Sequence, residues 1–250
     1  MKAMVLAAGL GTRLRPLTAV VPKPLLRVLD QPLILWNLFL LRRHHIVDVV
    51  INLHHLGKKV EDALGDGMEW GMRLCYSHEP RLLGTGGGIK QVESFFEGEP
   101  FLVLNGDTLI DINLTDLFTF HQSHQGLATM VLREDPDVEA WGVVETDERN
   151  QILTINGRGR SLQSSVAQRR RFMFAGVHVL NPLLLRDIPQ EEMSSIIEAY
   201  FMWLEYGADI YGYVVSGYWS DIGTPDRLTQ VRRDAKVGRI TIPQGYEGDA

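Results

Sequence analysis

The sequence predicts an α/β protein with three layers: a Rossmann-like mixed sheet of mostly parallel strands, with helices on both faces. Two observations predict this fold. Apolar runs of strand length alternate with stretches of helical length through the first hundred residues, as they do in repeated βαβ units. The runs at 47–53 and 100–104 are apolar almost throughout, which is the composition that strands need when both of their faces are buried.

The first half is expected to alternate strictly between strands and helices. Pro32 opens the first helix, where the missing N–H is tolerated, and a long apolar stretch follows it. The expected strands are 2–8, 47–53, 72–77 and 100–104, and the expected helices are 32–45, 57–64 and 88–96.

The pattern changes after Asp107. A helix is expected at 114–124, with Asn113 or Thr115 as its cap. The arginine-rich stretch 158–171 has little apolar pattern and is interpreted as a mobile surface loop. Further strands are expected at 128–132, 141–145, 151–155, 172–180 and 209–215, the second and third of them as a hairpin, and a further helix at 194–205.

The composition limits the possible partners. The 250 residues carry a net charge of −6 and one cysteine, Cys75. The acidic balance argues against non-specific binding of nucleic acid, and a single cysteine cannot form an internal disulfide. No apolar run reaches the ~18–20 residues of a membrane span, and the N-terminus lacks the pattern of a signal peptide. We therefore expect a cytoplasmic protein without a nucleic-acid or membrane partner, and we expect Cys75 to be buried in its strand.

Small and basic residues gather directly after the first expected strand. Gly9, Gly11, Thr12 and Arg13 lie within five positions, and Lys23 follows between two prolines, the second of which should hold it extended. Small residues let backbone N–H groups approach an anion, and arginine supplies forked donors for phosphate. The stretch fits neither the Rossmann fingerprint nor the P-loop. It predicts a site for a phosphate-rich ligand, and the alternative is a glycine-rich surface turn with solvated basic side chains.

Three further features complete the candidate site. The glycines of 84–88, which follow Glu79, offer bare backbone against which a nucleobase can lie, although a flexible linker has the same composition. Asp107 follows an apolar strand and points toward the usual ligand crevice, or it caps the next turn. Asp221 precedes Thr224-Pro225, a pair that can cap and open a helix.

The motifs together resemble those of a known family. The pattern L-A-A-G-x-G-T-R-L-x-P-L-T, followed by P-K-P-L, resembles the signature of the sugar-1-phosphate nucleotidylyltransferases, or NDP-sugar pyrophosphorylases. The stretch 85–88 is most similar to that of N-acetylmuramate-1-phosphate uridylyltransferases and mannose- or heptose-1-phosphate guanylyltransferases. The resemblance implies one GT-A-type domain over 1–234, in which 1–112 would bind the nucleotide and 113–234 the sugar, with 235–250 as a tail.

The resemblance implies a role for each matching residue. The catalytic residues would be Arg13, Lys23, Asp107 and Asp221, and Mg²⁺ would be bound by Asp107 and Asp221. The nucleotide would be bound by Ala7, Ala8, Gly9, Gly11, Thr12, Arg13, Glu79, Gly84, Thr85 and Asp107. The sugar phosphate would be bound by Lys23, Asn105, Gly142, Asn156 and Gly176. Many relatives have a lysine after the hairpin for the sugar phosphate; here that lysine is absent, and Arg158 or Arg160 is the expected replacement.

The reaction so implied joins a nucleoside triphosphate, UTP or GTP, to a sugar 1-phosphate and releases pyrophosphate, in a chain that could form a homodimer. Two other classes of protein stay open. A GT-A glycosyltransferase would normally use an Asp-x-Asp pair, which 105–107 lacks. A non-catalytic domain that senses a nucleotide or an NDP-sugar would bind without turnover.

Overall fold

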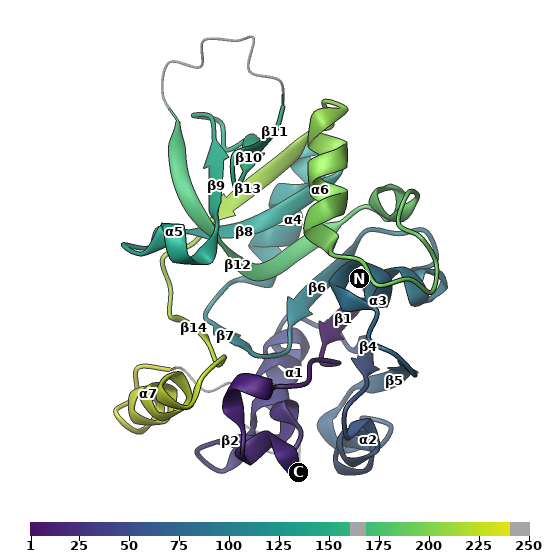
Figure 1. Cartoon of the computed structure of the whole chain (residues 1–250), viewed down its shortest axis with the longest axis vertical. Coiled ribbons are helices and arrows are strands. Elements are labelled where there is room, and N and C mark those ends of the chain that lie inside the picture. Colours follow the sequence, from purple (N-terminus) through teal and green to yellow (C-terminus); the bar gives the residue numbers. More distant parts are fainter. Residues whose placement is uncertain (161–168, 241–250) are drawn as a thin grey trace. The chain divides into compact units, whose positions relative to one another are not determined.

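The computed structural model describes residues 1–160 and 169–240 (Figure 1). The chain forms two compact units, and neither unit is one continuous segment. Unit 1 contains residues 1–82, residues 104–112 and the chain from Gly217 onward, whereas unit 2 contains 83–103 and 113–216. The expected division into 1–112 and 113–234 and the observed division into units both have a boundary after residue 112. The structural units differ from the expected halves because 83–103 joins the second unit and the chain returns to the first at Gly217.

Unit 1 is built on parallel strands. β1 (Ala3–Leu6) pairs with β4 (Asp48–Leu53), which pairs with β5 (Arg73–His78), and both pairings are parallel. β6 (Phe101–Asn105), which has residues in both units, is the other neighbour of β1. The Gly106 N–H donates to the Leu6 carbonyl at 2.9 Å. The carboxyl ends of β1 and β6, which carry the candidate residues, therefore lie together.

Three helices of unit 1 support these strands: α1 (Leu33–Arg43), α2 (Gly57–Leu64) and α7 (Pro225–Lys236). α7 begins at its proline as expected, and the Thr224 hydroxyl accepts the Arg227 N–H at 3.3 Å. A core cluster that includes residues of α1 and α7 joins both ends of the chain. It consists of Leu14, Leu26, Val28, Leu33, Trp36, Leu109, Ile222, Leu228, Val231, Ala235 and Ile240.

Short elements connect the larger ones in unit 1. Lys23 begins a 3-10 turn rather than being extended, because the Leu26 N–H donates to its carbonyl at 3.0 Å; Pro22 is extended in its place. The short helical turns are η1 (Thr12–Leu14), η2 (Leu17–Ala19), η3 (Lys23–Leu25) and η4 (Met68–Trp70). The short antiparallel pairs are β2 (Arg27–Val28) with β3 (Gln31–Pro32) and β7 (Thr108–Ile110) with β14 (Trp219–Asp221).

Unit 2 has a mixed sheet around its longest strand, β12 (Arg170–Leu180). β12 pairs antiparallel with β8 (Ala128–Arg133) and with β9 (Val143–Thr146). β9 pairs antiparallel with β10 (Ile152–Ile155), which forms the expected hairpin. β10 pairs antiparallel with β11 (Arg158–Gly159). β8 pairs parallel with β13 (Ile210–Val214).

In unit 2, α4 and α6 lie at the predicted positions, α3 differs from its prediction at both ends, and α5 was not predicted. The Asn113 side chain caps the first turn after it by accepting the N–H groups of Thr115 and Asp116, as the sequence predicts. The helices are α3 (Gly84–Gln91), α4 (Leu114–His124), α5 (Val138–Trp141) and α6 (Ile196–Glu205), with short turns η5 (Glu93–Phe96) and η6 (Pro182–Leu185).

α3 starts four residues earlier than expected, so its glycines lie inside the helix. The backbone of 192–196 packs directly against them: a Cβ added at Gly87 would lie 2.3 Å from the Glu192 carbonyl oxygen. The Gly86 N–H donates to the Ser194 carbonyl at 2.9 Å. This close approach is possible only without side chains, and its contacts offset the low helix propensity of glycine.

The expected mixed α/β fold is confirmed, with parallel pairing in unit 1 and mixed pairing in unit 2. Two further predictions of local structure are wrong. Cys75 is exposed, because β5 ends the order β6-β1-β4-β5 and its residues alternate between buried and open faces. Part of the expected loop 158–171 belongs to β11 and β12, and its residues 161–168 lie outside the described chain. Within residues 1–160 and 169–240, no helix combines the length and apolar character needed to cross a membrane.

Candidate active site

A chain of hydrogen bonds fixes the start of the glycine-rich loop in unit 1. The Ala7 N–H donates to the Asn52 side-chain oxygen at 2.8 Å, and the Asn52 amide donates to Glu79 Oε1 at 2.7 Å. Glu79 is only 3% exposed, and its carbonyl shares a 2.7 Å hydrogen bond with His54 Nδ1. The ends of β1, β4 and β5 are thus linked through side chains. Glu79 lies at the predicted end of a strand, with one carboxylate oxygen bound to Asn52.

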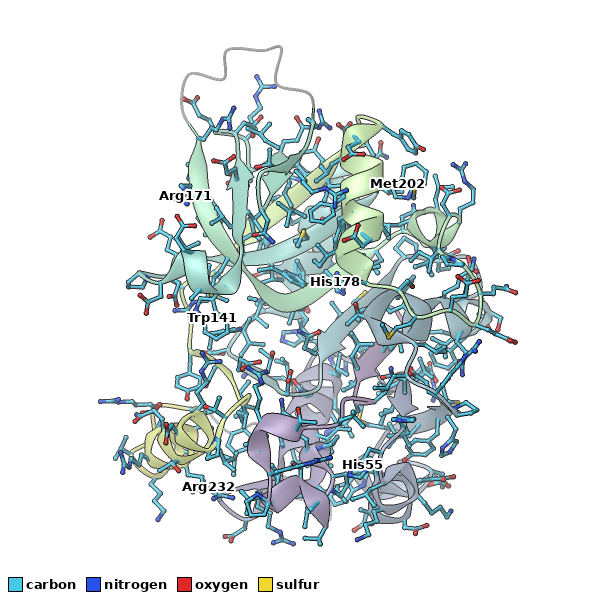
Figure 2. The ribbon with its side chains drawn as sticks, viewed as in Figure 1. His55, Trp141, Arg171, His178, Met202 and Arg232 are labelled. Carbon is cyan, nitrogen blue, oxygen red and sulfur yellow. The ribbon has the colours of Figure 1, made fainter. Side chains whose placement is uncertain are left out.

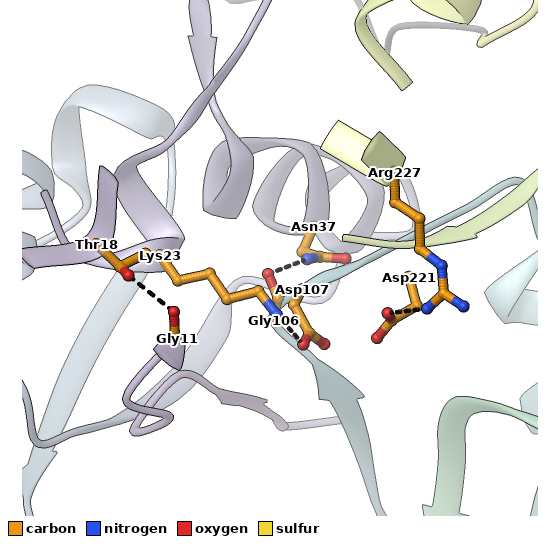
Figure 3. Close-up of polar contacts among 8 residues, drawn as sticks. All are labelled: Gly11, Thr18, Lys23, Asn37, Gly106, Asp107, Asp221 and Arg227. Atoms are coloured by element: carbon orange, nitrogen blue, oxygen red, sulfur yellow. Dashed lines mark hydrogen bonds and ion pairs between the residues drawn. The ribbon is translucent and has the colours of Figure 1, made fainter. Parts of the chain in front are cut away.

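The rest of the loop folds back on itself and on α2. The buried Thr18 hydroxyl donates to the Gly11 carbonyl at 2.7 Å (Figure 3). His55, labelled in Figure 2, lies 3.1 Å through Nε2 from the Thr18 carbonyl, and the Lys59 ammonium donates to the Val20 carbonyl at 2.8 Å. Ala8 is buried beneath this loop, whereas the backbone of its glycines stays at the surface. The loop has a defined shape that presents Gly9, Thr12 and Arg13 as exposed residues.

Lys23 and Asp107 form an ion pair in unit 1 (Figure 3). Asn105 and Gly106 lead from β6 into Asp107, and the buried Asn37 amide of α1 donates to the Gly106 carbonyl at 3.3 Å. Asn37 therefore holds the turn that carries the carboxylate. The Lys23 side chain is only 12% exposed, so its ammonium is held on Asp107 in a partly desolvated setting.

Backbone hydrogen bonds join the segments that carry Asp107 and Asp221. β14 pairs with β7, and the Ile222 N–H donates to the Asp107 carbonyl at 2.9 Å. The Asp221 carboxylate accepts a hydrogen bond of 2.8 Å from the Arg227 guanidinium, which comes from the first turn of α7 (Figure 3). The structure thus brings together the two aspartates that the sequence places 114 residues apart, and it pairs each with a cation.

Arg13 reaches the same group of residues at Gly223. A Cβ at Gly223 would lie 2.5 Å from Asp221 Oδ1 and 2.9 Å from an Arg13 guanidinium nitrogen. A side chain at this position would therefore displace the carboxylate and the guanidinium from their present places. Arg13 is exposed, and among the described residues it makes no hydrogen bond or ion pair. Its donors are available for an anion at this position.

The two carboxylates are suitable ligands for a divalent metal ion. In the part of the chain that the structure describes, no group of three or more His, Cys, Asp or Glu side chains could hold a metal by itself. Mg²⁺ is typically bound by one or two carboxylates, with waters and substrate phosphates completing its coordination. Asp107 and Asp221, on neighbouring backbone, fit that donor set.

In unit 2, the residues expected to contact a sugar are part of the β9–β10 hairpin and β12. The Asn156 side-chain oxygen accepts the Val143 N–H at 2.8 Å, and a Cβ at Gly142 would lie 3.0 Å from the same oxygen. Asn156 and Gly142 are therefore in contact, and Asn156 fixes the path of the chain beside Trp141. Gly176 has a φ of 78° and lies within the stretch of β12 where its register with β8 shifts.

Arg158 and Arg160 are occupied by other residues of unit 2. The Arg158 guanidinium lies 3.4 Å from Glu198 and 3.7 Å from Glu205, and it stacks 4.1 Å from the ring centroid of Phe201. Arg160 binds Asp209 at 2.7 Å and the Ala208 carbonyl at 2.7 Å. These contacts attach the hairpin to α6 and to the turn after it. Binding of the sugar phosphate by either arginine stays a prediction.

A buried histidine lies on the same strand, β12. His178, labelled in Figure 2, shares a 2.6 Å hydrogen bond through Nδ1 with the Tyr200 hydroxyl. Burial lowers the pKa of His178 to about 3 and raises the pKa of Tyr200 well above its usual value. Both groups are therefore neutral over the physiological range, and they join β12 to α6.

Gly84 and Thr85 also have structural partners in unit 2. The Thr85 hydroxyl accepts the Ile196 N–H at 3.0 Å, at the start of α6, and Gly84 packs against the Ser194 backbone. These contacts explain the glycine-rich composition without a nucleobase. Contact of Gly84 and Thr85 with a base stays a prediction.

Sequence reasoning missed four residues that shape the site: Thr18, Asn37, Asn52 and Arg227. Three of them are buried polar side chains whose partners are distant backbone atoms, and no local pattern marks such residues. Arg227 did leave a signal. A cation in the first turn of a helix is disfavoured by the helix dipole, so its presence after Thr224-Pro225 indicates a specific anionic partner.

Known proteins resemble this chain in sequence and in structure. An N-acetylmuramate alpha-1-phosphate uridylyltransferase of Neisseria meningitidis is 37% identical and aligns with 93% of this chain and 97% of its own length. A UTP–glucose-1-phosphate uridylyltransferase of Synechocystis is 32% identical over 97% of this chain, which spans 66% of that protein. A mannose-1-phosphate guanylyltransferase of Mycobacterium tuberculosis is 32% identical over 99% of this chain and 68% of its own length.

Solved structures share the fold. A proposed glucose-1-phosphate thymidylyltransferase of Bacillus anthracis superimposes with a TM-score of 0.81 over 94% of this chain and 95% of its own, at 24% identity. HddC from Yersinia pseudotuberculosis, complexed with GMP-PN, gives a TM-score of 0.75 over 94% of this chain and 99% of its own, at 22% identity.

The model of the Nucleotidyl transferase family matches residues 2–237, which include all of the candidate site residues. Members of this family generally use a divalent metal ion. The match confirms the class of enzyme that the signature predicts. This chain is a member of the Nucleotidyl transferase family.

Proposed function

We propose that the chain transfers a nucleotidyl group from UTP or GTP to a sugar 1-phosphate, which yields an NDP-sugar and pyrophosphate. One observation carries the proposal: two carboxylates, Asp107 in the turn before β7 and Asp221 on β14, lie among Lys23, Arg13 and the fixed backbone of the glycine-rich loop. This combination suits a metal-bound triphosphate. The family and the names of the relatives agree with it.

The reaction needs charge stabilisation more than it needs a base. An oxygen of the sugar phosphate, already anionic at pH 7, attacks the α-phosphorus in line; a new P–O bond forms. The bond from the α-phosphorus to the bridging oxygen breaks, and pyrophosphate leaves with its electron pair. The barrier comes from the approach of two anions and from the charge on the leaving group, both of which fixed cations reduce.

Each cation has a proposed position in this reaction. Arg13, whose guanidinium has no protein partner among the described residues, stabilises the departing β- and γ-phosphates. Lys23 moves from Asp107 to the α-phosphate and the incoming sugar phosphate. Mg²⁺, held by Asp107 and Asp221, supplies positive charge against the α-phosphate when bound. The ion pair of Lys23 with Asp107 is therefore a resting contact that substrate replaces.

Binding of the remaining groups is proposed as follows. The nucleotide contacts the backbone from Ala7 to Thr12 and, through its base, Glu79 and the 84–85 turn. The sugar contacts Asn105, Gly142, Asn156 and Gly176. Lys23 contacts the sugar phosphate in this proposal, and its ion pair with Asp107 places its ammonium beside the candidate site.

Pyrophosphate release tests the proposal. The purified chain with Mg²⁺ is offered UTP, GTP, dTTP, CTP and ATP, each with N-acetylmuramate, mannose, glucose, N-acetylglucosamine and heptose 1-phosphates. UTP with N-acetylmuramate 1-phosphate comes first, because the Neisseria relative aligns over almost the whole length of both chains. Release that depends on one base and one sugar supports the function. Nucleotide binding without release from any pair would favour a sensing domain, and consumption of an NDP-sugar without pyrophosphate would favour a glycosyltransferase.

A further inference from the structure

Arg227 is placed to control the Asp221 carboxylate. Its backbone is fixed by the Thr224 hydroxyl at 3.3 Å, and its guanidinium donates to Asp221 Oδ1 at 2.8 Å. The Asp221 side chain is 19% exposed and the Arg227 side chain 40%. The carboxylate has lost most of its water, so the guanidinium supplies the hydrogen bonds that water would otherwise give.

The position of Arg227 at the start of α7 is electrostatically unfavourable. Three residues into α7, a cation faces the positive end of the helix dipole, where acidic residues are favoured. A solvent-exposed ion pair adds little stability, so it would barely offset that cost. Stability alone gives little reason for an arginine at this position, whereas control of Asp221 gives a specific one.

We propose that Arg227 is a positioning residue that holds Asp221 and opposes the binding of a divalent cation until a nucleotide is present. The inference rests on the proposed role of Asp107 and Asp221 as metal ligands. In the free protein, each of these carboxylates is occupied by an intramolecular cation, Lys23 or Arg227. A divalent ion must then approach two positive side chains at short range.

The phosphates of the substrate reverse this balance. A triphosphate draws Lys23 away from Asp107 and adds several negative charges beside Asp221. The Arg227 guanidinium, whose side chain is 40% exposed, exchanges Oδ1 for a phosphate oxygen and so frees the Asp221 carboxylate for the metal. Metal affinity therefore becomes coupled to nucleotide binding, and the free protein binds metal weakly.

Binding of Mn²⁺, measured by electron paramagnetic resonance of the full chain without substrates, tests the proposal directly. R227M removes the guanidinium and should tighten Mn²⁺ binding about tenfold, since one unit charge a few Å from a divalent ion has this effect even at the screening of water. With a saturating non-hydrolysable analogue of the preferred nucleotide, the difference from wild type should shrink to within about threefold. R227K, which keeps the charge, should restore most of the weak binding.

Two matched variants separate this effect from general electrostatics. R233M removes the same charge from the exposed surface of the same helix and should leave the Mn²⁺ affinity within twofold. R227M in a D221N background should lose the tenfold gain, because Arg227 acts through Asp221. Should R227M fail to fold, R227Q provides the neutral variant.

The outcomes separate the two proposals. Unchanged Mn²⁺ affinity in folded R227M or R227Q, an equal gain in R233M, or a gain that persists with D221N would each overturn the role of Arg227. Failure of the metal-ligand assignment has a different signature: D107N and D221N would then bind Mn²⁺ and nucleotide together as tightly as wild type does.

Discussion

The two units use the same kinds of charged side chain in opposite ways. In unit 1, Lys23 binds the carboxylate of Asp107, and Arg13 nearby has no partner among the residues described. In unit 2, Arg158 has two glutamates and a ring, and Arg160 has an aspartate and backbone carbonyls. A cation with one carboxylate can exchange it for a phosphate. A cation with several partners on different elements holds those elements together instead.

This contrast shows why the replacement for the missing lysine could not be chosen from the sequence. Arg158 and Arg160 stand at the right place in the chain and carry the right charge. Their acidic partners, Glu198, Glu205 and Asp209, come 40 residues or more later, and only the fold brings them together. The partners of an arginine decide its role.

The largest effect is expected at the centre of unit 1. D107N and R13A should each lower kcat by about 10²-fold or more, the scale of losing one contact that the transition state needs. R15A is the matched control: Arg15 is exposed in the same loop and should change kcat less than threefold. Steady-state pyrophosphate release measures all three. A loss below threefold for D107N or R13A would remove that residue from the reaction.

A smaller loss is expected at Gly223. In G223A the new methyl group displaces Asp221 Oδ1 and the Arg13 guanidinium, which lie 2.5 and 2.9 Å from its position. A shift of less than about 1 Å in both groups relieves this contact. We expect kcat to fall roughly tenfold, because small misplacements at a reacting centre are costly. The melting temperature should stay nearly constant. A large drop in melting temperature with unchanged kcat would show that Gly223 serves packing alone.

Arg158 tests whether the cations of unit 2 have a structural role. R158M should leave kcat within threefold and reduce the free energy of unfolding by about 1 kcal/mol, the sum of a partly exposed cation–π contact and two exposed ion pairs. Urea denaturation and pyrophosphate release measure the two quantities on the same protein. R171M, which removes a simple exposed pair with Glu139, should change both less. A hundredfold loss of kcat in a stable R158M protein would instead place Arg158 on the sugar phosphate.

The smallest expected effect is a dependence of stability on pH that arises in unit 2. The pKa of His178 is about 3 in the folded protein and near 6.5 when unfolded, so between these values the unfolded state takes up a proton that the folded state does not. Stability is complete above pH ~6.5 and falls as the pH drops, by at most ~1.4 kcal/mol per unit. His121, whose pKa burial also lowers, contributes in the same direction.

Denaturation between pH 7.5 and 4.5 measures this slope. The double variant H178L/Y200F removes both hydrogen-bond partners at once, so no buried polar group is left alone. Its free energy of unfolding should vary less with pH than that of the wild-type protein. Equal slopes would mean that His178 is protonated within the fold.

Much of the fold could be predicted because its causes are local. Pro32 before an apolar run, the Asn113 cap and the Thr224-Pro225 pair each lie within a few residues of the helix that they start. The start of α3 could not be predicted in this way. Its glycines form a helix only because the backbone of 192–196, a hundred residues later, packs on them.

The residues of the candidate site also differ in whether the local sequence reveals them. Arg13, Lys23, Asp107 and Asp221 were found from motifs, and the structure brings these four together in unit 1. Arg227 was missed because its function depends on a carboxylate six positions earlier across a turn. A motif identifies residues that contact a ligand more readily than residues that hold those side chains in place.

The interleaving of the two units has a consequence for synthesis. The chain passes between the units after residues 82, 103, 112 and 216, and the core of unit 1 combines Leu14 and Trp36 with Val231 and Ile240. On the ribosome, the N-terminal strands and the glycine-rich loop emerge long before α7 can cover that core. Unit 1 cannot complete its folding until about residue 240 has left the exit tunnel, and unit 2 has the opportunity to fold first. Asp221 therefore reaches Asp107 only after the segment that contains α7 has been synthesised.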